Sequence, residues 1–296
     1  MRTHSPSRLL VLTAVGVGLV GVGAAGSSQA ADPFVAGQTS TRPVALGAAD
    51  SGRALERAAG LSRALGLPAG NGNVERLDDR FEHRVYDEVV SRDRTGRAVA
   101  IARFGTDGRL VMAVALGWHG SSARPIARDA VARGAAALVR AAGVGVSGPA
   151  AVRPLSSGWS VQWSRTAAGA PVLGDGVRVM LWPDGSFHGL AVSERRLAAA
   201  PGHRIAASTA ERFAVRTAAH RYGASAKDLS VESTSLAWVA PNDAWSAAAP
   251  DAPGDTLRLA WVVRLRADGD LAERLRGLQV WLDAGDGSVV GGDVME

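Results

Sequence analysis

The sequence carries few residues whose type and spacing could support catalysis. It has no cysteine, which excludes thiol chemistry and disulfides. Six histidines are present, and they are scattered along the chain: His4, His83, His119, His188, His203 and His220. None belongs to a His-Glu-x-x-His helix, and no Gly-x-Ser-x-Gly elbow is present. The sequence therefore predicts a protein that is not an enzyme and needs no metal or cofactor. A triad assembled from distant residues remains the open alternative.

Two glycine-rich segments have the spacing Gly-x-Gly-x-x-Gly, but both stand in the wrong context. One begins at Gly16 in an apolar N-terminal stretch, and the other begins at Gly143 after an expected helix. A dinucleotide fingerprint follows a strand and opens a helix, so neither segment predicts a nucleotide site. Asp283 and Asp286 lack the ordered run of oxygen ligands of a calcium loop. Asp286 is better explained by a turn with Gly287.

One strand-like segment carries side chains suited to binding a protein. Alternation along 257–266 places large apolar residues on one face and Arg258, Arg264 and Arg266 on the other. Trp281, on the following strand, is expected near these arginines. Arginine and tryptophan are enriched at binding hot spots. We therefore take these four residues as a candidate partner-binding surface for a protein with an acidic rim. The alternative is an ordinary solvated sheet face.

The elements that would position these residues indicate an α+β fold. The pattern predicts repeated units, each an amphipathic helix followed by an antiparallel β-meander, with helices packed on antiparallel sheets. The units are expected at 51–120, 121–200 and 201–296. Their helices are expected at 52–65, 126–142 and 208–222. The third helix begins with a predicted capping box, Ser208 to Glu211.

The strands of each unit are expected to end in a hairpin. The expected strands are 83–91, 97–104 and 109–116, then 151–165, 175–182 and 186–192, then 229–239, 256–266, 278–283 and 287–291. An Asp-Gly pair joins the last two strands of each unit: Asp107-Gly108, Asp184-Gly185 and Asp286-Gly287. Such pairs favour tight turns with glycine at positive φ.

The N-terminal segment has the pattern of a secretory signal peptide. Arg2 and Arg8 precede an apolar run over 9–25, and Ser28-Gln29-Ala30 gives a small-x-small cleavage site. We expect a signal peptide at 1–30 and a linker at 31–50. The protein would then be secreted or lie in the cell envelope, with no membrane span after signal cleavage. A retained N-terminal anchor is the alternative.

Composition narrows the class of partner. The chain has 33 basic and 28 acidic residues, a formal net charge of +5. Nucleic-acid-binding proteins concentrate basic charge on one surface, so this balance gives no reason to expect such a partner. Hydrophobic residues make up 47% of the 296-residue chain, enough for a large core.

Two segments resemble a known family. In the second unit they are the residues WSVQWSRTAAGAPVLGDGVRVMLWPDGSFHGL, Trp159–Leu190. In the third unit they are LRLAWVVRLR, 257–266, followed by VWLDAGDGSVVGGD, 280–293; the matched positions are Trp261, Asp283, Ala284 and Gly287. This pattern resembles the propeptide region of secreted thermolysin-like metallopeptidases, where a fungalysin/thermolysin propeptide-type domain precedes a PepSY domain. The resemblance implies a propeptide-like second unit and a PepSY-like third unit.

The resemblance also implies a role. It extends to the last hairpin, close to Glu296, and includes no peptidase domain. Modules of this kind are thought to inhibit or chaperone peptidases, which here would happen in trans. We therefore expect a secreted, non-catalytic binding module whose partner is a protein, such as a secreted metallopeptidase. The alternatives are a structural or apolar-ligand-binding envelope protein, and an enzyme with an unrecognised site.

Overall fold

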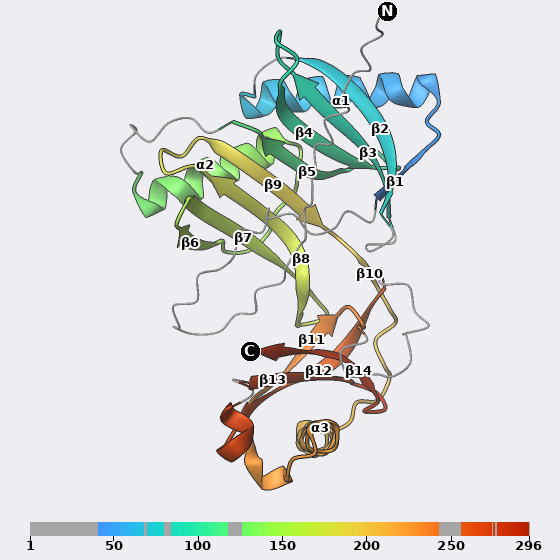
Figure 1. Ribbon diagram of the computed structural model, residues 1–296, viewed down its shortest axis with the longest axis vertical. Helices are drawn as coiled ribbons and strands as arrows, with labels where there is room; N and C mark the ends of the chain where they lie inside the picture. Colours follow the sequence, from blue (N-terminus) through green and yellow to red (C-terminus); the bar gives the residue numbers. More distant parts are fainter. Residues whose placement is uncertain are drawn as a thin grey trace, which may run out of the picture.

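The computed structural model describes residues 41–67, 70–79, 84–117, 126–242, 256–273, 275 and 277–295. Over these residues the chain is a mixed α/β protein with three α-helices and a 14-stranded, mainly antiparallel sheet (Figure 1). The predicted signal peptide, 1–30, lies outside the described residues.

The described elements have the following bounds. The helices are α1 (Ala48–Leu65), α2 (Arg128–Ala141) and α3 (Ala207–Tyr222), with 3₁₀ helices η1 (Ala226–Asp228) and η2 (Gly269–Glu273). The strands are β1 (Thr41–Val44), β2 (Asn71–Asp79), β3 (Arg84–Arg92), β4 (Ala98–Gly105), β5 (Leu110–Ala115), β6 (Ala151–Leu155), β7 (Gly158–Ala167), β8 (Ala170–Leu181), β9 (Phe187–Ser193), β10 (Arg196–Leu197), β11 (Leu229–Val239), β12 (Thr256–Ala267), β13 (Gly277–Asp283) and β14 (Val289–Met295).

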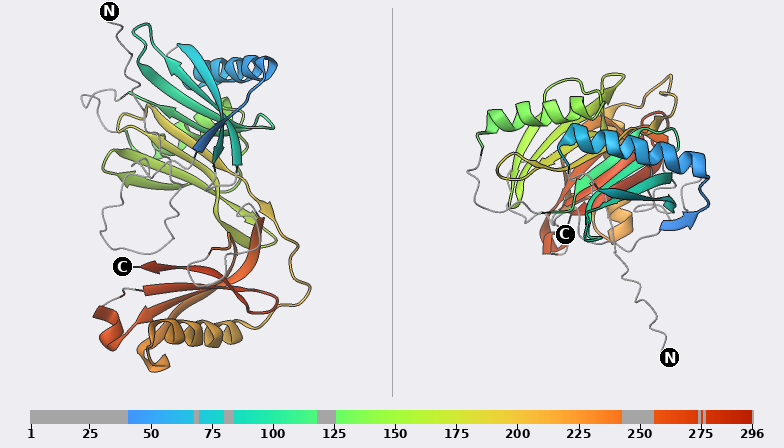
Figure 2. Two further views of the ribbon diagram at one scale, coloured as in Figure 1. Left: turned by 45° about the vertical axis from the view of Figure 1, so that its right-hand side comes forward. Right: turned by 90° about the horizontal axis from the view of Figure 1, so that it is seen from above.

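Strands β1 to β9 form one part of the sheet, in the order β1-β2-β3-β4-β5-β9-β8, with β7 and β6 continuing from β8. Helices α1 and α2 lie side by side on one face of these strands (Figure 2). Small residues on the buried helix faces, such as Ala58 and Ala135, bring both helices close to the sheet. The largest core therefore lies between these two helices and the sheet.

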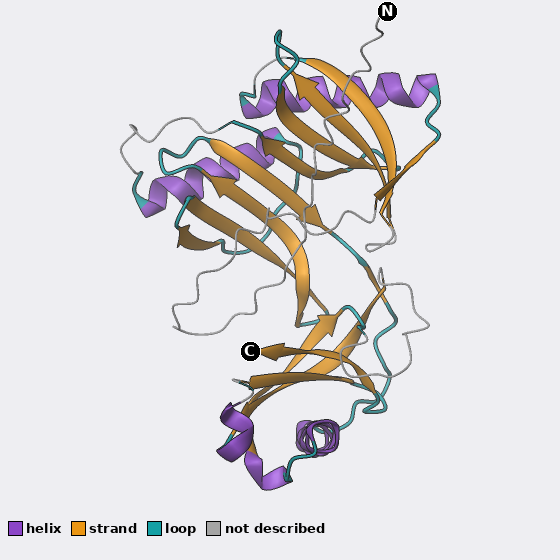
Figure 3. Ribbon diagram, viewed as in Figure 1, coloured by secondary structure: helices purple, strands orange, loops and turns teal. Residues whose placement is uncertain are grey.

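Strands β11 to β14 form the second part, which carries α3 and the short helices η1 and η2 (Figure 3). Strand β11 meets β8 at a single parallel pair, Trp238 with Val172. Ala210, Ala214 and Ala218 recur every four residues on α3 and are fully buried against β12 and β13. Helix α3 lies on the side of its sheet that points away from β2–β9 (Figure 1). Its outer face is thus left uncovered by the other two helices.

The elements differ from the expected ones in several places. Residues 41–44, expected in a linker, form β1 on the edge of β2, and α1 begins at Ala48 rather than at residue 52. Strand β2 was not expected because it opens with Asn-Gly-Asn, which is typical of a turn. It forms because its nine residues pair one by one with β3. The expected strand 151–165 is two strands, β6 and β7, joined by a tight turn.

The capping box predicted at the start of the third helix is wrong. The N-cap of α3 is Ala206, and no side chain caps it. The Glu211 carboxylate instead accepts a hydrogen bond from the Thr234 hydroxyl at 2.8 Å, which links α3 to β11. The Glu211 carboxylate, which a capping box would use, is therefore bonded to the sheet instead of to the start of the helix.

The three Asp-Gly turns form as predicted, with glycine at positive φ. Gly108, Gly185 and Gly287 have φ of +80°, +84° and +76°. Each also lies against a side chain from a helix or from the segment before it: Arg57 of α1, Ile126 before α2 and Phe213 of α3, respectively. Each hairpin end is therefore packed beneath a helix or the segment that leads into one.

We expect Gly287→Val to destabilise the protein by about 2 kcal/mol, because it adds strain at positive φ and a clash. A Cβ at this position would lie 2.8 Å from two Phe213 ring carbons. Gly143→Val is the matched control, since Gly143 has φ +73° but open space around it, and should cost about 1 kcal/mol. Urea denaturation measures both. Equal losses would show that packing on Phe213 is unimportant.

The turn between β7 and β8 offers a stabilising substitution. Ala167 pairs with Ala170, which leaves Ala168 and Gly169 as a two-residue loop with φ of +48° and +77°. Both residues at positive φ define a type I′ turn, which favours asparagine followed by glycine. Ala168→Asn should therefore raise the free energy of unfolding by about 0.5 kcal/mol or more. A lower or unchanged thermal midpoint would contradict this assignment of the turn.

Candidate functional site

The structure places the four predicted binding residues on one face of β12 and β13. Strand alternation puts Arg258, Arg264 and Arg266 on the side of β12 opposite α3. Trp281 pairs with Val262 in the neighbouring strand, so it shares that face. Arg258 and Arg266 are exposed, whereas Arg264 and Trp281 are partly buried. The four residues therefore share one face of the two strands, and their role in binding stays a prediction.

This face is nevertheless not an open polar surface. At its centre Ala237, Val239, Ala260 and Val262 are buried together, and Leu173 of β8 packs against them. The arginines are consequently separated into two groups at the ends of β12. The whole face points toward β2–β9 rather than outward (Figure 1). Neighbouring strands thus limit how a large partner would approach it.

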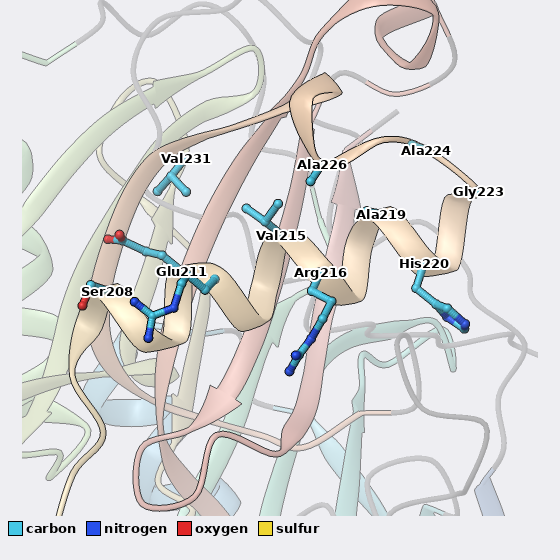
Figure 4. A pocket seen from close by; sticks show the side chains of 11 residues that line it. Ser208, Glu211, Val215, Arg216, Ala219, His220, Gly223, Ala224, Ala226 and Val231 are labelled. Atoms are coloured by element: carbon cyan, nitrogen blue, oxygen red, sulfur yellow. The ribbon is translucent and has the colours of Figure 1, made fainter.

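Helix α3 borders a second feature, an open groove of about 970 Å³ (Figure 4). Val215 and Ala219 of α3 form its apolar floor, and Val231 of β11 lines one side. Val231 is 40% exposed, so part of its apolar surface faces water. Ala226 of η1 continues that side. The groove is therefore mainly apolar on the floor and on the β11 side.

The opposite side of the groove is cationic. Arg212, Arg216 and His220 follow one another every fourth residue on α3, and all three are exposed. Figure 4 shows Arg216 and His220 projecting from the side of α3 away from Val231. We call these three residues the cationic row, after the charge of its two arginines. The groove thus has a basic side and, facing it, a side on which apolar Val231 and Ala226 lie together with the Glu211 carboxylate.

The arginines of the cationic row have no acidic partner among the described residues. Arg212 donates a hydrogen bond to the Thr209 hydroxyl at 3.1 Å. The Arg216 guanidinium carbon lies 5.0 Å from the centroid of the Phe213 ring. Both charges are therefore free to interact with an anion in the groove.

The β11 side of the groove is a partly unpaired sheet edge. Strand β11 pairs with β12 along its length, but over the described residues it pairs with β8 only at Trp238. A bulge between Val231 and Ser233 leaves Glu232 out of register. Bulges twist an edge and disfavour the addition of another strand. A molecule that binds along this edge of β11 is therefore expected to contact mainly side chains rather than backbone groups.

Sequence reasoning did not find this groove. The spacing of Arg212, Arg216 and His220 was visible in the sequence, and four-residue steps place side chains on one helix face. Their importance depends on β11 lying beside α3, which the helix sequence does not reveal. The alternation of β12, by contrast, was enough to place its arginines on one face.

Among the described residues, no group of three or more His, Asp or Glu side chains is placed so that it could hold a metal ion. His188 stacks on Trp182 with ring centroids 3.9 Å apart, and His220 belongs to the cationic row.

No described helix is both long and apolar enough to cross a membrane. The groove is the feature of this part of the chain best suited to bind another molecule.

Comparisons with known proteins give no family assignment. No family model and no curated protein matches the chain. Among solved structures it is similar to the Bacillus megaterium YpeB C-terminal domain, with 12% sequence identity and a TM-score of 0.44. That alignment covers 86% of this chain and 99% of the other. At this identity and TM-score the similarity establishes neither a family nor an activity.

Proposed function

We propose that the protein is a secreted, non-catalytic binding module that inhibits or chaperones a peptidase or another envelope protein in trans. The observation that carries the proposal is the groove beside α3. Its floor is apolar, and its exposed arginines make no ion pair with a described carboxylate. Both features suit recognition of a protein segment. The resemblance to peptidase propeptides supplies the class of partner.

The residues that carry this resemblance act in the structure as framework. The Trp261 indole N–H donates to the Ile205 carbonyl at 3.1 Å, and the Asp283 carboxylate accepts from the Gly285 amide at 2.8 Å. Gly287 forms the final turn. They support the idea of a PepSY-like third unit, while the groove supports binding. Helix-plus-strand order and the three packed hairpin glycines support the repeated units.

Titration of a secreted thermolysin-type metallopeptidase with the purified full chain tests the proposal. We expect peptide hydrolysis to fall with added protein, or the yield of active peptidase after denaturation to rise. A chymotrypsin-type serine peptidase, which has a different fold, is the control for non-specific effects. No change in either the activity or the refolding yield, at an excess of the chain, would contradict the peptidase role.

The arginine face of β12 is a second surface to test in the same assay. If it contributes to docking, the double variant Arg264→Glu, Arg266→Glu should associate more slowly, and the difference should shrink at high salt. An association rate equal to that of the parent at low salt would exclude this face. The inward direction of the face makes the groove the stronger candidate of the two.

A further inference from the structure

We infer that the groove beside α3 binds an extended acidic segment of the partner, with acidic side chains at alternate positions. This inference rests on the proposed binding function and names the kind of segment recognised. It is carried by three observations: the spacing of the cationic row, the apolar residues that face it, and the lack of a counter-charge for its arginines among the described residues.

The spacing of the cationic row matches alternate residues of an extended chain. Arg212 and His220 are eight residues apart on α3, a rise of about 12 Å along the helix axis. In an extended segment, the first and fifth residues are about 13 Å apart, and alternate side chains point the same way. Three acidic side chains at every second position can therefore face Arg212, Arg216 and His220 together.

The apolar side of the groove suits the residues in between. In an extended segment the intervening side chains point in the opposite direction. For a segment that runs along α3 with its acidic side toward the cationic row, that direction is toward Val231 and Ala226. Both are exposed, so small apolar residues of the segment would remove their apolar surface from water. An alternating acidic and apolar sequence therefore uses both sides.

The charges around the groove are mixed, and its arginines are the ones without a counter-charge among the described residues. The carboxylate of Glu211 accepts a hydrogen bond from Thr234. Glu232 lies on the bulge of β11, and Lys227 on η1 is exposed. The arginines of the cationic row make no ion pair with a described carboxylate, so an acidic segment would supply their counter-charges. Electrostatic complementarity of this kind mainly sets specificity and association rate.

The test uses a fluorescent seven-residue peptide with Glu at positions two, four and six and Ala elsewhere. Fluorescence anisotropy measures its binding to the purified full chain at low and at physiological salt. We expect binding that weakens with salt, and a loss of about tenfold for the double variant Arg212→Glu, Arg216→Glu. The matched control, Arg133→Glu with Arg140→Glu, makes the same charge change on exposed α2 residues and should bind as the parent does.

Three results would overturn the inference: no binding of the Glu peptide to the parent, equal binding by the groove variant, or equal binding of a peptide with Gln in place of Glu. Far-ultraviolet circular dichroism confirms that each variant is folded. The inference and the proposed function fail in different ways. If the groove variant still modulates the metallopeptidase as the parent does, the module binds its partner elsewhere. If the unmodified protein has no effect on the metallopeptidase, the proposed peptidase role is wrong, and this holds whether or not the Glu peptide binds to the groove.

Discussion

Replacing Gly176 by alanine is expected to destabilise the protein by about 3 kcal/mol or more. Gly176 lies in β8 opposite Ser164 and has φ +131°, a conformation that side chains rarely adopt. A Cβ there would also lie well under 3.0 Å from the backbone carbonyl oxygen of Trp163. Because the obstacle is backbone, the strands themselves would have to separate.

The matched control for this substitution is Gly169→Ala, in the turn that joins the same two strands. Gly169 also has positive φ, +77°, but nothing lies within 4 Å of the position of its Cβ. It should therefore lose about 1 kcal/mol, from conformational strain alone. Urea denaturation followed by tryptophan fluorescence compares the two. Similar midpoints for Gly176→Ala and Gly169→Ala would show that β7 and β8 do not approach as closely as described.

The second large effect is expected at Asp175, whose side chain is fully buried beside Gly176. Its carboxylate accepts hydrogen bonds from the backbone and Nε of Arg195, each at 2.7 Å, and from Ser193 and Arg165 at 3.0 and 3.1 Å. Asp175→Asn keeps the shape but leaves both guanidinium groups without their counter-charge. We expect a loss of about 3 kcal/mol, as for other broken buried ion pairs.

Asp268→Asn is the control for the removal of a charge. Asp268 pairs with Arg266 at 3.1 Å, but both side chains are about half exposed. Exposed ion pairs contribute little to stability, so the loss should stay below about 1 kcal/mol. If the two Asn variants unfold at the same urea concentration, the buried ion pairs of Asp175 do not stabilise the fold as its contacts indicate.

The Asp175 site also predicts how stability depends on pH. Burial alone would raise the pKa of this carboxyl, but the Arg195 amide and guanidinium and the Ser193 hydroxyl stabilise the anion. Its folded pKa therefore lies below 3.8. As the pH falls below 3.8, the unfolded chain takes up a proton that the folded chain does not, so stability is lost toward the folded pKa. Asp175→Asn should show a shallower loss over this range; an unchanged slope would contradict it.

The sequence predicted those parts of the fold that depend on local patterns. Strand β11 was expected over its observed range, 229–239, because alternation and flanking turn residues mark it. The three Asp-Gly turns follow from the backbone preference of glycine. Strand β2 was not expected, because its polar start has no strand signal and forms only by pairing with β3. Tertiary pairing decided that element.

The candidate sites were also predictable only where they depend on local sequence patterns. Strand alternation placed Arg258, Arg264, Arg266 and Trp281 on one face, but Leu173, which packs on the centre of that face, comes from β8. The contacts of Asp175 were equally hidden, since Ser193 and Arg195 lie 18 and 20 residues further along the chain. Periodicity within one helix or strand predicts the face on which a side chain lies. It does not predict which other element packs against that face.

The most direct test of the proposed binding role is hydrogen exchange of the full chain with and without a catalytically inactive thermolysin-type metallopeptidase. If the groove is the binding site, backbone amides of α3 and of 229–236 should exchange more slowly in the complex, because the partner covers them. Amides of α1 and α2 serve as the internal reference and should be unchanged. No protection anywhere, or protection that leaves α3 and β11 unaffected, would contradict binding of this partner at the groove.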